Sequence, residues 1–226
     1  MNFKDKVVVI TGASKGLGKA LAETFSKEGS LLALIARKKF DLKLNKASYF
    51  QADISNETEF TEVVQEIVKK FGRIDIFVNN AGIWIPPTPF IEIPSKRIKD
   101  LFEVNVFGSI YGSKLAALQM KKQKSGGLIL QVISTSALEG REGESIYCSA
   151  KFALDGFSKS IRKELGKFNI KVYSVFPGGM KTELFNEKIP DSYDDYMNPR
   201  NVVSKIINNL KLDTPEEELI LRRPKK

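Results

Sequence analysis

A tyrosine and a lysine, Tyr147 and Lys151, lie four residues apart in the second half of the chain. In a helix, residues at this spacing share one face. A free phenol has a pKa of about 10, and a neighbouring ammonium favours the phenolate and lowers that value. Such a pair can exchange a proton with an oxygen within hydrogen-bond reach. Ser134, thirteen residues before the tyrosine, could hold that oxygen beside the phenol.

A glycine-rich loop near the start of the chain offers a second kind of site. Apolar residues 7–10 lead into TGASKGLG at residues 11–18. Glycines allow a tight turn and a close approach of backbone to a ligand. A helix that begins here points its free N–H groups and the positive end of its dipole at an anion. The loop predicts a phosphate site, with a turn that binds no ligand as the alternative. Its candidate residues are Gly12, Ser14, Lys15, Gly16, Leu17 and Gly18.

The composition excludes several kinds of site. The chain has no histidine and a single cysteine, Cys148, so it has no histidine base, no imidazole zinc site and no disulfide within the chain. We expect no metal site and a reducing, cytoplasmic location. The apolar runs are far shorter than the roughly 20 residues of a membrane span, and the first residues lack the pattern of a signal peptide. Neither a membrane partner nor secretion is therefore expected.

The formal net charge of +9 raises the question of an acidic partner. The lysines are scattered through every segment, and two clusters, at 121–124 and 222–226, contain no interleaved aromatic residues. Stacking platforms for bases need such aromatics. We favour a lysine-rich surface and no nucleic-acid partner, and keep a basic nucleic-acid binder as the competing class.

These residues fall at the ends of alternating strand-like and helix-like segments. Short apolar runs predict strands at 6–11, 31–36, 49–52, 75–79, 128–133, 170–176 and 218–221. Longer amphipathic stretches predict helices at 16–28, 57–71, 95–120, 147–165 and 201–210. Strands that are apolar throughout suit a parallel sheet covered on both faces. The pattern predicts an α/β fold: one Rossmann-like, doubly wound domain over residues 1–226, with about seven strands.

With its motifs in this order, the sequence resembles the short-chain dehydrogenase/reductase family from residue 4 to about 185. The glycine loop, Ser134 and the Tyr-x-x-x-Lys pattern carry the resemblance, and the family's strand alignment favours Ser134 over its rival Ser136. Four further segments match the family: Asp53-Ile54, Asn79-Asn80-Ala81-Gly82, Asn105, and the PGGMKT run at 177–182.

The resemblance implies an oxidoreductase with a nicotinamide cofactor, which supplies hydride to a small ketone or aldehyde or removes it from the alcohol. It implies a catalytic set of Ser134, Tyr147, Lys151 and Asn105, with Asn105 orienting a water that relays protons from Lys151. It also implies a homodimer or homotetramer built through the helices at 95–120 and 147–165. Beyond the glycine loop, the implied cofactor contacts are Asp53 at the adenine, Ile54, Asn80, Ala81, Gly82, Tyr147, Lys151, Pro177, Gly178 and Thr182.

Arg37 predicts NADP(H) in preference to NAD(H). An acid at the end of the second strand would bind the ribose hydroxyls of NAD, but this strand runs into Arg37, Lys38 and Lys39, with no acid before Asp41. A guanidinium binds phosphate oxygens in bidentate geometry, and Lys15 adds a second cation. Residues 37–49 leave room for about one short helix, which predicts a more open adenosine edge.

Residues at about 178–199 are expected to form a substrate lid, and Trp84 with the proline-rich stretch at 86–89 could line the entrance. The lid's acids favour a neutral or cationic substrate over an anion, unless they all face water. The leading hypothesis is an NADPH-dependent carbonyl reductase. A 3-oxoacyl carrier-protein reductase and a non-catalytic NADP(H)-binding sensor remain open alternatives. The acids of the lid are Glu183, Glu187, Asp191, Asp194 and Asp195.

Overall fold

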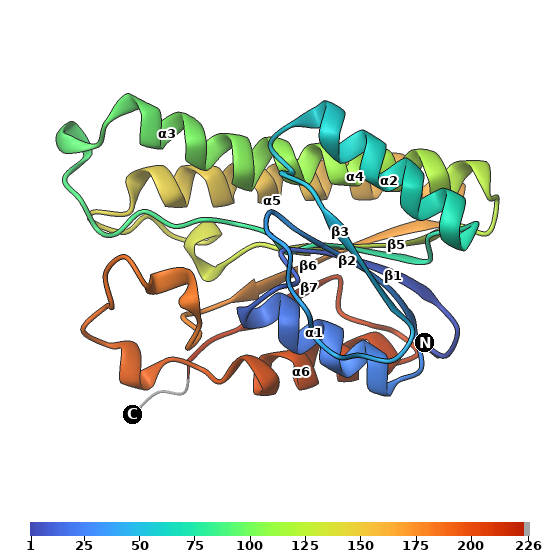
Figure 1. Cartoon of the computed structure of the whole chain (residues 1–226). Coiled ribbons are helices and arrows are strands. Elements are labelled where there is room, and N and C mark those ends of the chain that lie inside the picture. The colour runs from blue at the N-terminus through green and yellow to red at the C-terminus, as the bar shows by residue number, and fades with distance from the viewer. Residues whose placement is uncertain (224–226) are drawn as a thin grey trace.

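The computed structural model describes residues 1–223; Pro224, Lys225 and Lys226, the end of the basic cluster at 222–226, lie outside the described residues. Within this range, seven parallel strands form one sheet in the order β3-β2-β1-β4-β5-β6-β7 (Figure 1). This confirms the predicted doubly wound α/β fold. The strands are β1 (Val7–Thr11), β2 (Leu31–Ala36), β3 (Ala47–Gln51), β4 (Ile76–Asn79), β5 (Gly127–Val132), β6 (Ile170–Pro177) and β7 (Glu218–Leu221).

Helices cover both faces of the sheet (Figure 1). The helices α1 (Gly16–Lys27) and α6 (Pro199–Lys211) lie on one face, and α2 (Glu57–Phe71), α4 (Gly108–Lys122) and α5 (Ser145–Leu165) lie on the other. None of the helices in residues 1–223 is long and apolar enough to cross a membrane.

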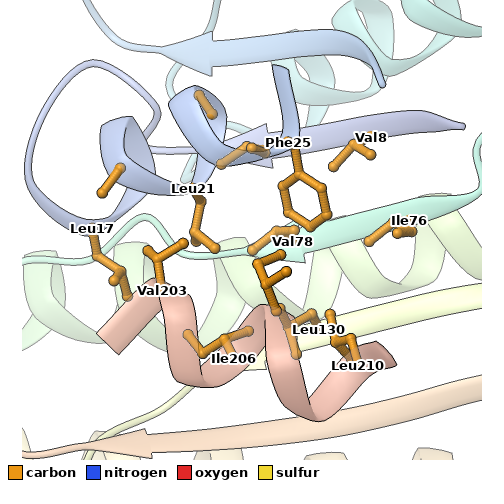
Figure 2. Packing of buried hydrophobic residues seen from close by; sticks show 14 of the residues in the cluster. Val8, Leu17, Leu21, Phe25, Ile76, Val78, Leu130, Val203, Ile206 and Leu210 are labelled. Carbon is orange, nitrogen blue, oxygen red and sulfur yellow. The ribbon is translucent and has the colours of Figure 1, made fainter. Parts of the chain in front are cut away.

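The alternation of side chains along each strand explains why the strands are apolar throughout. Successive residues of a strand point to opposite faces, so Val8 and Ile10 belong to the core under α1 and α6, while Val9 belongs to the core under α2 and α4. Figure 2 shows the first of these cores, in which two helices meet the central strands. Its labelled side chains are Leu17, Leu21 and Phe25 of α1, Val203, Ile206 and Leu210 of α6, and Val8, Ile76, Val78 and Leu130 of the sheet.

The helical region predicted at 95–120 is helical, but it is not one uniform helix. It consists of α3 (Ser95–Phe102), a π-helical turn (Glu103–Phe107) and then α4. A π-helical turn inside a longer helix is uncommon and often marks a functional position. Here the turn contains Asn105, which is almost completely buried.

The short helix that residues 37–49 could have held is absent from the described structure. These residues run from β2 to β3 without helical hydrogen bonding. Phe40, Leu42 and Leu44 recur at every second position and pack against the core under α1 and α6. That spacing is typical of extended backbone and not of a helix, which explains why the available length holds no helix.

Candidate active site

A cavity of about 800 Å³ lies along the carboxyl ends of the strands, where doubly wound sheets bind ligands. Residues from all the predicted motifs except Asn105 line it. Gly18 and Asn105 are the predicted site residues that stand outside its lining in the described structure. The predicted residues that do line it are Gly12, Ser14, Lys15, Gly16, Leu17, Arg37, Asp53, Ile54, Asn80, Ala81, Gly82, Ser134, Tyr147, Lys151, Pro177, Gly178 and Thr182.

The glycine loop forms a closely packed cradle that has no room for side chains at Gly12 and Gly18. A Cβ on Gly18 would lie 2.2 Å from the carbonyl oxygen of Gly12, and one on Gly12 would lie 2.8 Å from Cα of Ala81. Gly12 also has a φ of +64°, a conformation that L residues rarely adopt. The glycines therefore let the loop pack closely against its neighbours, and its cavity-lining backbone fits the pyrophosphate of a nicotinamide dinucleotide.

The start of α1 keeps its N–H groups available to an anion. Lys15, the residue before the helix, makes no capping hydrogen bond in the described structure, and the first turn holds no acid. Asn80 anchors the loop: its side-chain amide donates to the carbonyl oxygens of Thr11 at 2.9 Å and Gly12 at 3.3 Å. The Thr11 hydroxyl in turn accepts the backbone N–H groups of Asn80 and Ala81. Asn80 therefore holds the cradle in place as well as lining the cavity.

Ser134, Tyr147 and Lys151 converge at one end of the cavity. Tyr147 and Lys151 lie on α5, and the Lys151 Nζ is 5.6 Å from the centroid of the tyrosine ring. Ser134 follows β5 and lies near enough to Tyr147 to act on its phenol, because it lowers the pKa of the tyrosine. All three residues are buried, although a cavity adjoins them. Ser136, the rival to Ser134, instead accepts a hydrogen bond from Arg141 at 3.1 Å.

Burial governs the protonation of this group. It raises the pKa of Tyr147 above its ordinary value, and the contact with Ser134 partly opposes that effect. Burial also lowers the pKa of Lys151 to about 8. The net direction for Tyr147 is upward, because the cost of removing the phenolate from water exceeds the stabilisation that its neighbours give. The lowering expected from Lys151 together with an oxidised nicotinamide stays a prediction.

Asn105 contacts the segment that follows β4. Its Oδ1 accepts the N–H of Ile83 and its Nδ2 donates to the carbonyl oxygen of the same residue, each at 2.8 Å. The adjacent Gly82 leaves little space, since a Cβ there would lie 3.2 Å from Asn105 Oδ1. The side chain thus positions backbone beside the cavity, and its relay role stays a prediction.

The adenosine end of the cavity carries the predicted cations. Arg37 directly follows β2, is exposed, and lines the cavity together with Lys15 and Lys38. Asp53 has a local structural contact: its Oδ1 accepts the backbone N–H of Ser55 at 3.0 Å and the Ser55 hydroxyl at 2.6 Å.

The opposite end is enclosed by aromatic rings of residues 178–199. Phe185 lies edge-on to Trp84, with ring centroids 4.9 Å apart, and to Tyr196 at 5.2 Å. The base of this segment is fastened by a parallel bridge between Met180 and Met197.

The cavity lining at this end also includes four residues that the sequence did not single out: Phe185, Tyr196, Arg97 and Arg141. The general expectation of a lid at about 178–199 was the only signal for the first two. No group of metal-ligating side chains occurs within residues 1–223.

Comparisons with known proteins agree with this architecture. The family model described as short chain dehydrogenase matches residues 6–192. Diacetyl reductase [(S)-acetoin forming] of Staphylococcus epidermidis is 36% identical over 190 residues, which cover 80% of this chain and 74% of that protein. Sorbitol-6-phosphate 2-dehydrogenase of Klebsiella pneumoniae is 34% identical over 204 residues, covering 84% and 76%. The structure of an alcohol dehydrogenase from Thermococcus sibiricus, complexed with 5-hydroxy-NADP, superposes with a TM-score of 0.86 at 25% identity, covering 99% and 100% of the two chains.

Proposed function

The chain belongs to the short-chain dehydrogenase family, and from that premise we propose that it is an NADPH-dependent carbonyl reductase for a small ketone or aldehyde. Family membership makes it an oxidoreductase that binds a nicotinamide cofactor and acts on C=O or CH–OH groups. The observation that carries the finer proposal is the convergence of Ser134, Tyr147 and Lys151 at the end of the cavity that begins at the glycine cradle.

In this proposal Tyr147 is the general acid. When bound, the nicotinamide would supply the hydride to the carbonyl carbon. The Tyr147 hydroxyl gives its proton to the carbonyl oxygen, where negative charge develops, and the Ser134 hydroxyl donates a hydrogen bond to the same oxygen. The raised pKa of Tyr147 keeps the phenol protonated at neutral pH, as an acid must be. Lys151, near the ring, favours the phenolate that proton donation leaves, and Asn105 orients the water that restores the proton.

Arg37 supports the preference for NADP(H). It stands where an acid would select NAD, and its exposed guanidinium can pair with a 2′-phosphate, with Lys15 nearby on the cavity wall. Reduction is the direction that this cofactor favours.

We further propose a single cofactor-binding domain with residues 178–199 as a lid over the substrate. The aromatic side chains of Phe185 and Tyr196 in the lid, together with Trp84 outside it, favour a compact, neutral carbonyl compound. The single buried Cys148 agrees with a reducing cytoplasm. A homodimer or homotetramer through α4 and α5 completes the proposal.

The test is NADPH consumption against ketones, aldehydes, diketones and 3-oxoacyl thioesters, run beside NADH and beside Tyr147→Phe. We expect turnover of a small carbonyl compound with NADPH and its near-complete loss in the variant. Turnover of the thioesters alone would replace the proposal with a carrier-protein reductase. Tight NADPH binding without turnover of any class would favour a sensor.

A further inference from the structure

The turn that follows Ser134 is held by an arginine that belongs to none of the motifs. The guanidinium of Arg141 donates from Nη1 to the hydroxyl of Ser136 at 3.1 Å and from Nη2 to the hydroxyl of Thr135 at 3.0 Å. Both acceptors lie in the short 3₁₀ turn that starts immediately after Ser134. One planar group thus grips two consecutive residues of this turn.

The same turn fixes the hydroxyl of Ser134. The backbone N–H of Ser136 donates to Ser134 Oγ at 3.0 Å, and the N–H of Ala137 donates to the Ser134 carbonyl oxygen at 3.0 Å. A hydroxyl donates one hydrogen bond and accepts two. Because this backbone N–H occupies one acceptor position, the hydroxyl hydrogen of Ser134 points away from it and is free for Tyr147, whose pKa Ser134 lowers, or for a substrate oxygen.

The loop that carries Arg141 has hydrogen bonds of its own, apart from those to the turn. The N–H of Thr88 donates to the carbonyl oxygen of Gly143 at 3.0 Å, and the N–H of Glu144 donates to that of Arg141 at 3.1 Å. Carboxylates flank the guanidinium: Glu139 at 3.3 Å and Glu144 at 3.8 Å. The loop that carries Arg141 is therefore held by its own hydrogen bonds and ion pairs, and it keeps the guanidinium beside the turn.

We propose that Arg141 is a positioning residue for carbonyl reduction: by holding the hydroxyls of Thr135 and Ser136, it fixes Ser134 against the hydroxyl of Tyr147. This inference rests on the proposed function, because it takes Ser134 and Tyr147 to act on the carbonyl oxygen. Arg141 lines the cavity, but in this proposal it acts through the turn, because the guanidinium hydrogen bonds go to Ser136 and Thr135. Small displacements of positioned groups lower the rate of the catalysed step strongly. A loosened turn would therefore slow the chemical step.

Charge is the other way in which Arg141 could act on the tyrosine. The groups that influence the pKa of Tyr147 include Arg141, which lowers it, and Glu144 and Cys148, which raise it. Lys151 stands beside the ring. A double variant, Thr135→Val with Ser136→Ala, separates the two effects, because it removes both anchors while the guanidinium keeps its charge and its flanking carboxylates.

The first experiment compares kcat and KM for Arg141→Met, Arg141→Lys and the double variant. We expect Arg141→Met and the double variant to lose about tenfold to a hundredfold in kcat, with the KM for NADPH unchanged. Arg141→Lys should retain part of the rate, since an ammonium can reach one of the two hydroxyls. The matched control is Arg200→Met on α6, which loses an arginine paired with Glu23 outside the cavity lining and should keep the wild-type rate. Unchanged kcat in the double variant would overturn the positioning role.

The second experiment measures the titration of the Tyr147 phenol, and it needs neither cofactor nor turnover. Protein labelled with 3-fluorotyrosine is titrated by ¹⁹F NMR; fluorine makes each phenol more acidic, and Tyr147→Phe identifies the Tyr147 resonance among the six tyrosines. Ser134→Ala measures the rise in the titration midpoint when the serine contact is lost. We expect Arg141→Met and the double variant to raise the midpoint as well. If Arg141→Met raises it and the double variant leaves it unchanged, Arg141 acts by charge alone and the inference is wrong.

The two experiments also distinguish this inference from the proposed function. Wild-type protein that consumes no NADPH with any carbonyl substrate would contradict the proposed function, while the NMR titration would still show whether Arg141 holds Ser134 against Tyr147. Turnover by the wild type, together with a double variant that is normal in both experiments, would contradict the inference alone.

Discussion

Arg97 on α3 and Glu187 on the segment at 178–199 are joined by two hydrogen bonds, of 2.6 and 2.7 Å, between two guanidinium nitrogens and two carboxylate oxygens. Both residues line the cavity. The pair fastens the free part of the segment to the opposite wall, while the bridge between Met180 and Met197 fastens its base. Both side chains are substantially exposed, so the pair is a weak latch that can open, despite its bidentate geometry.

Glu187→Gln is expected to loosen this latch. The KM for the carbonyl substrate should rise several-fold, because bound substrate would no longer be enclosed as well. Trp84, the only tryptophan, reports the change directly, since its ring contacts Phe185 of the segment and is buried. Its fluorescence should shift to the red in the variant. Asp191→Asn, an exposed acid of the same segment, serves as the control; equal emission and KM in all three proteins would contradict the latch.

The same pair predicts a pH dependence of known sign. The hydrogen bonds from Arg97 lower the pKa of Glu187 below its ordinary value of 4.5. The contribution of the pair is therefore complete above that ordinary value and is lost as the pH falls through the lowered pKa. In wild-type protein the fluorescence of Trp84 should keep the short emission wavelength of a buried ring below pH 4.5. An unpaired glutamate would already be protonated there. Loss of that emission centred at pH 4.5 or above would show that the pair does not hold the segment.

Lys151→Met is expected to stabilise the protein while it abolishes activity. Burial lowers the pKa of Lys151 from 10.5 to about 8, which corresponds to about 3 kcal/mol of lost stability at neutral pH. Between those two pH values the unfolded chain binds more protons, so this cost shrinks as the pH rises. Melting curves without cofactor should give the variant the higher Tm at pH 7, and the difference should decrease toward pH 10.5.

Lys159→Met is the matched control on the same helix. Its hydrogen bond with Asp155 raises the pKa of Lys159. That lysine therefore adds stability below its ordinary pKa, and the contribution is lost as the pH rises through the raised value. Removing it should lower the Tm at pH 7. If both variants shift the Tm in the same direction, burial is not what governs Lys151.

The positions of the motif residues could be predicted from the sequence because topology determines them. In a parallel sheet all strands end at one edge, so residues that follow β1, β2, β4, β5 and β6 meet there whatever the details of packing. Gly12, Arg37, Asn80, Ser134 and Pro177 stand at or just beyond these strand ends. The predicted strand bounds differ from the observed ones by at most two residues, within the usual uncertainty at the ends of elements, and those of β2 and β7 coincide.

The remaining features depend on contacts between segments that carry no local pattern. Glu187 reaches Arg97 across 90 residues of sequence, and no spacing in either segment indicates the partner. The raised pKa of Tyr147 follows from burial, which tertiary packing creates. The alternation of Phe40, Leu42 and Leu44 did contain a signal for extended backbone, and sequence reasoning did not use it.

Arg37→Glu is expected to reverse the preference between the two nicotinamide cofactors. The change removes the phosphate-binding guanidinium and supplies the acid that binds ribose hydroxyls. The ratio of kcat/KM for NADPH to that for NADH should fall by roughly tenfold to a hundredfold, the range for losing one charge-assisted contact. Lys38→Met is the control, because Lys38 is the neighbouring exposed cation on the same wall. Equal ratios in wild type and Arg37→Glu would place cofactor selection elsewhere.

The outward face of α4 and α5 gives the prediction about assembly. A groove of about 260 Å³ lies between these helices and is lined mainly by apolar side chains, among them Leu118 and Phe157. Leu118 is 59% exposed, and large apolar side chains gathered on one surface mark an interface. Leu118→Glu would place a charge in the centre of the proposed contact between two copies and should yield a monomer in light scattering, where the wild type should be a dimer or tetramer.

The matched control for assembly is Ile91→Glu, because Ile91 is even more exposed, at 89%, and belongs to the short turn before α3, outside the groove. The same charge placed there should leave the oligomer intact. If apolar exposure alone drove association, both substitutions would dissociate it, and the groove would have no special role. A wild-type monomer at micromolar concentration would remove the proposed interface altogether. Dissociation by Leu118→Glu and not by Ile91→Glu would place the contact on α4 and α5.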